Sequence, residues 1–253
     1  MGNCWVDPYA STQYVYQTPP EGEPPFDAKF LRKDKVKFPQ GKWDADFECL
    51  NALDEFSQVS DWRLRIIIPD PPAPDSAVTA SEIRELVALK AQRQALMPEI
   101  QAQDRYFQLY FIGLLTMTER SHPATYLLLK IAARIGETVM SQQKMKFSRA
   151  RPSQIYPPLA PPLDVANHPS YPSGHSVVSF MMAFAAAEAV QNQAVRASLA
   201  ALALRIGRLR EVAGFHFRSD TAAGQMVAAQ AMAIVRTLYK YQAVRNAAAL
   251  EWQ

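Results

Sequence analysis

The stretch Asn167-His168-Pro169-Ser170-Tyr171-Pro172-Ser173-Gly174-His175-Ser176 decides how the fold of this chain is predicted. A proline-rich segment precedes it, and no proline follows Pro172. Ser173 is suited to cap a helix that begins at Gly174. The first N–H groups of a helix have no acceptor inside that helix, so they can bind an anion. Two interpretations stay open here: a capped helix with a surface histidine, and a helix end that binds an anion beside His175.

The segments on both sides of this stretch have the apolar periodicity of helices. After it, runs rich in Ala and Met predict helices at about 174–191, 194–213 and 218–245. Before it, we expect a helix that starts with a capping box at Thr79–Glu82, and Pro98 either ends that helix or begins the next. Further helices are expected at about 100–117 and 123–147. No strand pattern of any length occurs. The predicted fold is therefore an all-α helical bundle over residues 79–253.

Residues 1–78 differ from the rest in composition. They hold ten of the nineteen prolines, and their aromatic residues follow neither a helical nor a strand period. Such a segment is too apolar for a disordered tail. We expect an irregular, proline- and aromatic-rich N-terminal arm packed on the core, with a short helix within 43–56 and at most one extended piece at 63–68.

Composition excludes several classes of protein. A net charge of +3 gives no electrostatic support to nucleic-acid binding. No apolar run reaches the roughly 20 residues of a membrane-spanning helix, and the chain does not begin like a signal peptide. We expect a soluble protein, either periplasmic or secreted with its signal peptide not present in this chain, or cytoplasmic. Cys4 and Cys49 could form one disulfide or stay free thiols.

Two further clusters could carry chemistry. Lys144 and Arg151 are seven residues apart, which is two helical turns, and Pro152 favours an extended backbone at Arg151. Two cations at a helix exit can bind a tetrahedral oxyanion, although a solvated basic face has the same pattern.

The other cluster begins at Arg210. Gly214 can end its helix, and Ser219 or Asp220 can cap the next one. His216 and Asp220, four residues apart, can meet on one side. A carboxylate on one imidazole nitrogen leaves the other nitrogen free as a nucleophile, but the pair could equally tie two helices together.

Taken together, the clusters Lys144-x6-Arg151-Pro152, Pro172-Ser173-Gly174-His175 and Arg210-x5-His216-x3-Asp220 resemble the three-part signature of the type 2 phosphatidic acid phosphatase (PAP2) superfamily. The resemblance covers about residues 100–235. One position departs from the pattern, because Leu209 stands where the family usually has serine. The superfamily includes soluble bacterial class A acid phosphatases, which this chain resembles most, membrane lipid phosphatases and vanadium-dependent haloperoxidases. It implies a helical-bundle core of the acid phosphatase/vanadium haloperoxidase type.

The resemblance also implies residue roles. His216 would attack phosphorus and form a phosphohistidine, Asp220 would orient it, and His175 would protonate the leaving alcohol. The groups implied to hold the phosphate are Lys144, Arg151, Ser173, Gly174 and Arg210. No metal is implied, and four histidines without an acidic cluster offer no dinuclear metal site.

Two activities remain within the superfamily. The expected one is a cofactor-free acid phosphatase that acts on a small phosphorylated substrate, and chain length favours it. The alternative is a vanadium-dependent haloperoxidase with vanadate on His216. His168, at a position where bromoperoxidases carry an additional active-site histidine, favours that alternative, although it could be a loop residue near the entrance. A homo-oligomer is consistent with either activity.

Overall fold

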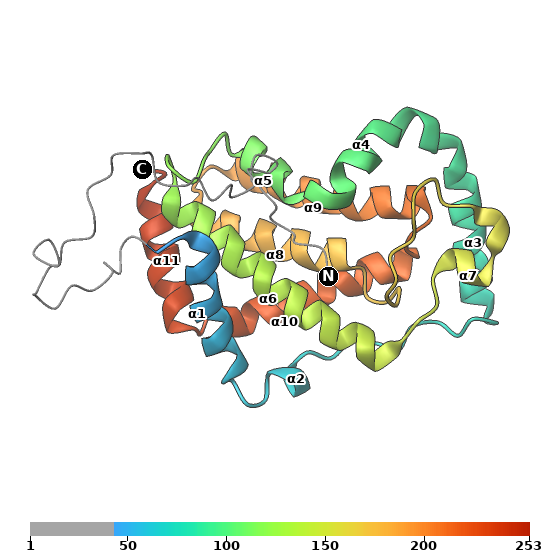
Figure 1. Cartoon of the computed structure of the whole chain (residues 1–253), viewed down its shortest axis with the longest axis horizontal. Helices are drawn as coiled ribbons and strands as arrows, with labels where there is room; N and C mark the ends of the chain where they lie inside the picture. Colours follow the sequence, from blue (N-terminus) through green and yellow to red (C-terminus); the bar gives the residue numbers. More distant parts are fainter. Residues whose placement is uncertain (1–42) are drawn as a thin grey trace, which may run out of the picture. The chain divides into compact units, whose positions relative to one another are not determined.

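Helix α8 (Gly174–Ala189) is the central element of the fold. Its sequence is apolar on every side, which is typical of a helix buried all round. Accordingly, residues such as Val177, Met181 and Ala185 are fully buried. The helix packs most extensively on α6 (Pro123–Phe147), α9 (Gln193–Ala213) and α10 (Arg218–Val235), which surround it in Figure 1.

The computed structural model describes residues 43–253, and Ala45–Gln253 form one compact unit. The described residues contain helices and no strand, so the all-α prediction is confirmed. None of their helices is both long enough and apolar enough to cross a bilayer. The remaining elements are α1 (Ala45–Ser57), α2 (Trp62–Arg65), α3 (Ala77–Leu89), η3 (Lys90–Gln92), α4 (Arg93–Tyr106), α5 (Gln108–Leu114), α7 (Pro152–Ile155), η4 (Pro157–Leu159) and α11 (Tyr239–Leu250).

Most of the predicted N-terminal arm, residues 1–42, lies outside the described residues, and so does Cys4. Within 43–78, the short helix is present as α1, which packs on α6 and α11 and holds Cys49 as a buried free thiol. Residues 62–65 form one helical turn, where at most an extended piece was expected.

Several helix ends differ from the prediction. The cap of α3 is Ser76, whose hydroxyl accepts a hydrogen bond from the Thr79 N–H, so the capping box at Thr79–Glu82 is wrong. Pro98 lies inside α4, and the chain instead bends through the 3₁₀ turn η3. The predicted 218–245 helix is interrupted between α10 and α11. The Glu55 carboxylate on α1 caps the new N-terminus by accepting from the N–H groups of Tyr239 and Lys240.

Two glycines let α9 and α10 approach the N-terminus of α8 closely. A Cβ at Gly207 would lie 2.8 Å from the Ser176 hydroxyl oxygen, and one at Gly224 would lie 2.6 Å from the Ser176 Cβ and 2.9 Å from the Ser173 carbonyl oxygen. Real Cβ atoms do not come so close. The stretch that begins α8 is therefore enclosed by its neighbours.

Candidate functional site

The three sequence clusters meet at the N-terminus of α8. Backbone hydrogen bonds join them: the Ser173 N–H donates to the Asp220 carbonyl at 3.0 Å, and the Ser170 N–H donates to the Arg149 carbonyl at 2.8 Å. Ser173 caps α8, as predicted, and its hydroxyl accepts from the Ser176 N–H at 3.4 Å. The unpaired N–H groups of the first turn begin at Gly174, beside the other two clusters.

The predicted ends of the flanking helices bring the other clusters to this point. Gly214 ends α9 with a φ of +81°, a left-handed conformation that glycine adopts without strain. Arg151 is extended, with a φ of −73° and a ψ of 153°, as the following proline favours. α6 already ends at Phe147, so Lys144 and Arg151 do not share a helix face as the seven-residue spacing suggested.

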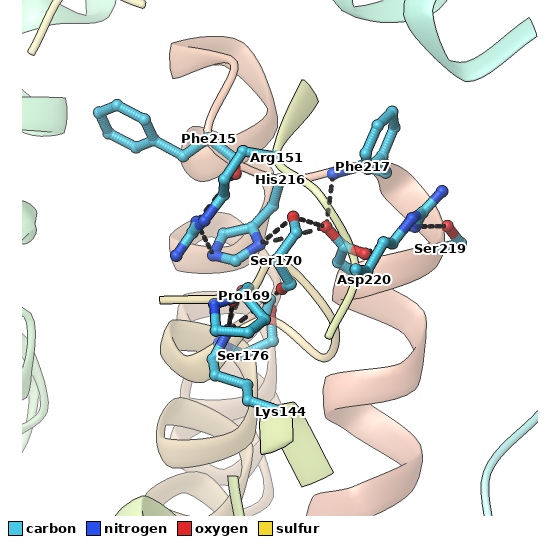
Figure 2. Close-up of polar contacts among 12 residues, drawn as sticks. Lys144, Arg151, Pro169, Ser170, Ser176, Phe215, His216, Phe217, Ser219 and Asp220 are labelled. Atoms are coloured by element: carbon cyan, nitrogen blue, oxygen red, sulfur yellow. Dashed lines mark hydrogen bonds and ion pairs between the residues drawn. The ribbon is translucent and has the colours of Figure 1, made fainter. Parts of the chain in front are cut away.

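His216 and Asp220 form the centre of the site, and Figure 2 shows the two side chains facing each other. His216 Nδ1 lies 3.2 Å from Asp220 Oδ2. The same oxygen accepts hydrogen bonds from the Ser170 hydroxyl at 2.5 Å and the Phe217 N–H at 2.9 Å. Burial alone would raise the pKa of Asp220, but its bonds to His216, Arg149 and Ser170 lower it to about 2. Asp220 is therefore an ionised carboxylate with no exposed surface.

The other ring nitrogen of His216 faces Arg151. Nε2 lies 3.2 Å from Arg151 Nη1, which also donates to the Phe215 carbonyl at 3.0 Å. A guanidinium group can only donate, so Nε2 carries a lone pair and Nδ1 carries the proton bonded to Asp220. Burial, together with the charge of Arg151, lowers the pKa of His216 to about 3. His216 is thus a neutral imidazole whose lone pair points toward a cation.

Lys144 adds a second cation to this group. Its Nζ donates to the carbonyls of Pro169 at 2.5 Å and Ser170 at 3.2 Å. Burial, with the nearby charge of Arg151, lowers its pKa to about 7. An anion that entered the site would oppose that shift, because its negative charge favours the protonated lysine.

Arg210 and His175 form a second group. Arg210 has no exposed surface and donates to the Asp104 carboxylate at 3.0 Å and the Ile100 carbonyl at 2.7 Å. Its Nε is buried without a hydrogen-bond partner among residues 43–253, so one donor of this cation is unused. The His175 ring packs on Phe107, with 4.6 Å between ring centroids, and its Nε2 lies 3.3 Å from the carbonyls of Gln103 and Asp104.

Electrostatics connect the two groups. Burial lowers the pKa of His175 well below its ordinary value, and the charges of Arg210 and His216 act in the same direction. His175 therefore lies within electrostatic range of both His216 and Arg210. No direct hydrogen bond joins Arg210 to Lys144, Arg151 or His216 among the described contacts.

His168 lies at the edge of the site. The residue as a whole is exposed, and its Nδ1 lies in a partly buried contact, 3.0 Å from Arg151 Nη2. Partial burial and the charges of Lys144 and Arg151 lower its pKa to about 4. His168 thus contacts a residue of the site from the solvent side.

Sequence reasoning missed two groups that hold the centre together. The Ser170 hydroxyl and the Arg149 guanidinium both bind the Asp220 carboxylate, Arg149 at 2.6 Å. In the sequence, Arg149 is only one of four basic residues between positions 144 and 151. Nothing in the sequence distinguishes its burial from the exposure of its neighbour Lys146, because the difference depends on where α10 packs.

The loop between α6 and α8 is held mainly through its main chain. Lys90 donates to the Pro158 carbonyl at 3.0 Å, and Arg93 donates to the carbonyls of Leu159 at 2.9 Å and Ala160 at 2.8 Å. Lys144 binds the carbonyls of Pro169 and Ser170, and Arg151 binds that of His168 at 2.9 Å. Cations therefore fix the loop backbone along its length.

The side chains of the site do not resemble the ligands of a metal ion. Among residues 43–253, no group of three or more His, Cys, Asp or Glu side chains is arranged to hold a metal ion. The donors that converge are cations, a neutral imidazole and helix N–H groups, which suit an oxyanion.

The match to one protein family agrees with this chemistry. Residues 123–245 match the sequence model of the PAP2 superfamily, and this span contains the three clusters of the site. Among solved structures, the chain is similar to a transmembrane PAP2-type phosphatidylglycerolphosphate phosphatase from Bacillus subtilis. The likeness has 16% sequence identity and a TM-score of 0.38, and covers 76% of this chain and 94% of that one. A TM-score at this level does not by itself establish a common fold.

Proposed function

The chain belongs to the PAP2 superfamily through residues 123–245, and we propose that it is an acid phosphatase that hydrolyses small phosphate monoesters without a metal, through a phosphohistidine. The superfamily supports a phosphatase-type activity in general, whereas the substrate class and the intermediate are part of the proposal. The observation that carries it is the state of His216. Asp220 holds its Nδ1–H at 3.2 Å, so the Nε2 lone pair is directed toward the Arg151 guanidinium.

In the proposed first step, the phosphoryl group of the ester enters between Arg151 and His216, so that these two side chains no longer contact each other directly. The Nε2 lone pair forms a bond to phosphorus as the P–O bond to the leaving group breaks. The charge on the equatorial oxygens is balanced by Lys144, Arg151 and Arg210, whose unused Nε is an additional donor. Ser173 and the N–H of Gly174 complete the phosphate site at the start of α8.

His175 supplies the proton. The negative charge of a bound phosphate raises the pKa of this imidazole, which favours its protonated form. Protonated His175 then donates to the leaving oxygen, so that an alcohol departs rather than an alkoxide. In the second step, a water molecule loses its proton to His175 and attacks phosphorus. The P–N bond breaks, and phosphate and neutral His216 are released.

One observation favours the alternative activity. His168 contacts Arg151 at 3.0 Å from the solvent side, so a third imidazole borders the site. Vanadate has the shape and charge of phosphate and would fit the same residues, with His216 as its ligand. It would supply peroxide activation when bound. The cations Lys144, Arg151 and Arg210 would hold its oxygens.

A paired assay separates the two activities. We expect hydrolysis of p-nitrophenyl phosphate in the presence of EDTA, with inhibition by added vanadate. The same preparation, given vanadate, peroxide and bromide, should not brominate a dye. Bromination that depends on vanadate, without metal-free phosphatase turnover, would overturn the acid phosphatase proposal.

Variants of the two imidazoles test the residue roles in the same assay. His216→Ala should remove turnover of every ester, because no other group forms the bond to phosphorus. His175→Ala should slow alkyl phosphates far more than p-nitrophenyl phosphate, whose leaving group needs no proton. Substantial activity in His216→Ala would show that the nucleophile has been assigned to the wrong residue.

A further inference from the structure

Arg149 is a buried arginine that lies outside the phosphate site and that the proposed mechanism does not use. Its Nη1 donates to Asp220 Oδ1 at 2.6 Å and to the Ser219 hydroxyl at 2.7 Å, and its Nη2 donates to Glu82 Oε2 at 3.1 Å. Its guanidinium carbon lies 3.8 Å from the centre of the Phe217 ring. Each of these partners limits the positions that the guanidinium can take.

The two oxygens of Asp220 have different partners. Oδ2 accepts from His216, Ser170 and the Phe217 N–H, whereas Oδ1 accepts from Arg149. Among residues 43–253, Arg149 is the one arginine or lysine paired with this carboxylate. Without it, the carboxylate would be buried with no cationic partner, because His216 is neutral, and such a charge is costly.

Arg149 is itself fixed from the opposite side. Glu82 of α3 accepts from Arg149 and also from the Ser219 N–H at 2.7 Å and the Ser219 hydroxyl at 3.0 Å. Ser219 lies beyond Asp220 as seen from His216 in Figure 2. A chain of bonds thus runs from α3 through Arg149 and Asp220 to His216, and it ends at the Nε2 lone pair.

We propose that Arg149 is a positioning residue for the reaction, because it fixes Asp220 Oδ1 so that Oδ2 holds the Nδ1–H of His216 and Nε2 faces phosphorus. The inference rests on the proposed function for its kinetic consequences. It does not rest on that function for its structural consequence, which is the tautomer of His216.

The kinetic test is Arg149→Met assayed with p-nitrophenyl phosphate. We expect kcat to fall about 10- to 100-fold, a range typical of groups that act through another site residue, while KM changes by less than about 3-fold. The pH below which kcat falls should also rise, because without Arg149 the pKa of Asp220 is higher. Arg149→Lys keeps the charge and should recover part of the loss. A large rise in KM with kcat unchanged would instead place Arg149 in phosphate binding and overturn the proposal.

A double-mutant cycle with Asp220→Asn separates positioning from general stability. If Arg149 acts through Asp220, adding Arg149→Met to Asp220→Asn should lower kcat by less than about 2-fold. Independent, multiplicative losses would overturn the proposal. Lys130→Met is the matched control, since Lys130 is equally buried and ion-paired, with Asp46, and lies about 21 Å from Lys144 along α6. It should lower the melting temperature and leave the pH profile unchanged.

The tautomer can be observed without any turnover. The sequence contains four histidines, so ¹⁵N-histidine labelling with His216→Ala for assignment identifies the His216 ring signals. The native protein should show Nδ1 protonated, and Arg149→Met, or Arg149→Lys if the first variant does not fold, should show a mixture of both tautomers. An unchanged tautomer would overturn the positioning role. If the native protein shows no phosphatase turnover but the variant shows this NMR change, the proposed function is wrong and the positioning role of Arg149 stands.

Discussion

Lys144 is a buried ammonium group close to another cation, and its titration should limit activity on the alkaline side. Its pKa is lowered to about 7, first by burial and then by Arg151. Below pH 7 the group is charged and holds the phosphate, and above pH 7 it becomes neutral. We therefore expect kcat/KM to fall above pH 7, approaching about tenfold per pH unit. Steady-state assays between pH 5 and 9 measure this directly.

Lys144→Arg is the control for that prediction. Arginine stays charged across this pH range, so the alkaline fall should disappear even if the altered shape lowers the overall rate. A native profile that stays flat from pH 6 to 9 would contradict the assignment of Lys144 as a phosphate-binding cation.

At the scale of single residues, fixed spacing made some of the site predictable. The four-residue interval between His216 and Asp220 predicted a contact that is present at 3.2 Å, whereas Lys144 and Arg151 do not share the helix face that their interval suggested. Arg149 and Ser170 could not be identified, because their roles depend on Asp220 being buried between them. The contact of Arg210 with Asp104 was also unpredictable, since it depends on how α4 crosses α9.

The approach of α10 to α8 depends on a residue without a side chain. In Gly224→Ala, the new Cβ would meet the Ser176 Cβ at 2.6 Å and the Ser173 carbonyl oxygen at 2.9 Å, so the helices must separate. We expect the free energy of unfolding to fall by about 1–3 kcal/mol, with a loss of activity because Ser173 and Gly174 move. Urea denaturation and the phosphatase assay measure the two effects.

Gly113→Ala in α5 provides the comparison, because nothing lies within 4 Å of the Cβ position there. That substitution should leave activity unchanged and, in a helix, raise stability slightly. Equal stability of the two alanine variants would show that α10 has room to move away from α8.

Helices were predictable where the periodicity and the cap are both local. α8 begins after Ser173 and α9 ends at Gly214, as expected. The break between α10 and α11 was not predictable, because its cap comes from Glu55, far away in the sequence. At Pro98 a helix boundary was predicted where none exists, since packing of α4 on α9 outweighs the local cost of an internal proline.

For the molecule as a whole, the buried histidines should make folding sensitive to acid. The folded pKa of His216 is about 3, below the value of about 6.5 of an unfolded histidine, and burial also lowers the pKa of His175. As the pH falls below 6.5, the unfolded chain therefore binds protons that the folded chain excludes. His216 alone should reduce the free energy of unfolding by about 3 kcal/mol between pH 7 and pH 4.

Urea denaturation at several pH values between 7 and 4 tests this sensitivity. His216→Asn should lose less stability over the same range, because asparagine does not titrate. Saturating inorganic phosphate should protect the native protein, since the ligand binds only the folded state. An unfolding free energy that does not change with pH would contradict the buried, neutral state of His216.

The loop between α6 and α8 is held in place by hydrogen bonds to its main-chain carbonyl oxygens. The donors are the side chains of Lys90, Arg93, Lys144 and Arg151. A main-chain carbonyl is present whatever side chain its residue carries. The exposed positions Asp164, Ala166 and Asn167 can therefore be exchanged without removing any of these anchors. For an evolving lineage or a combinatorial library, this loop is a segment whose exposed side chains can be varied while the groups of the site stay in place.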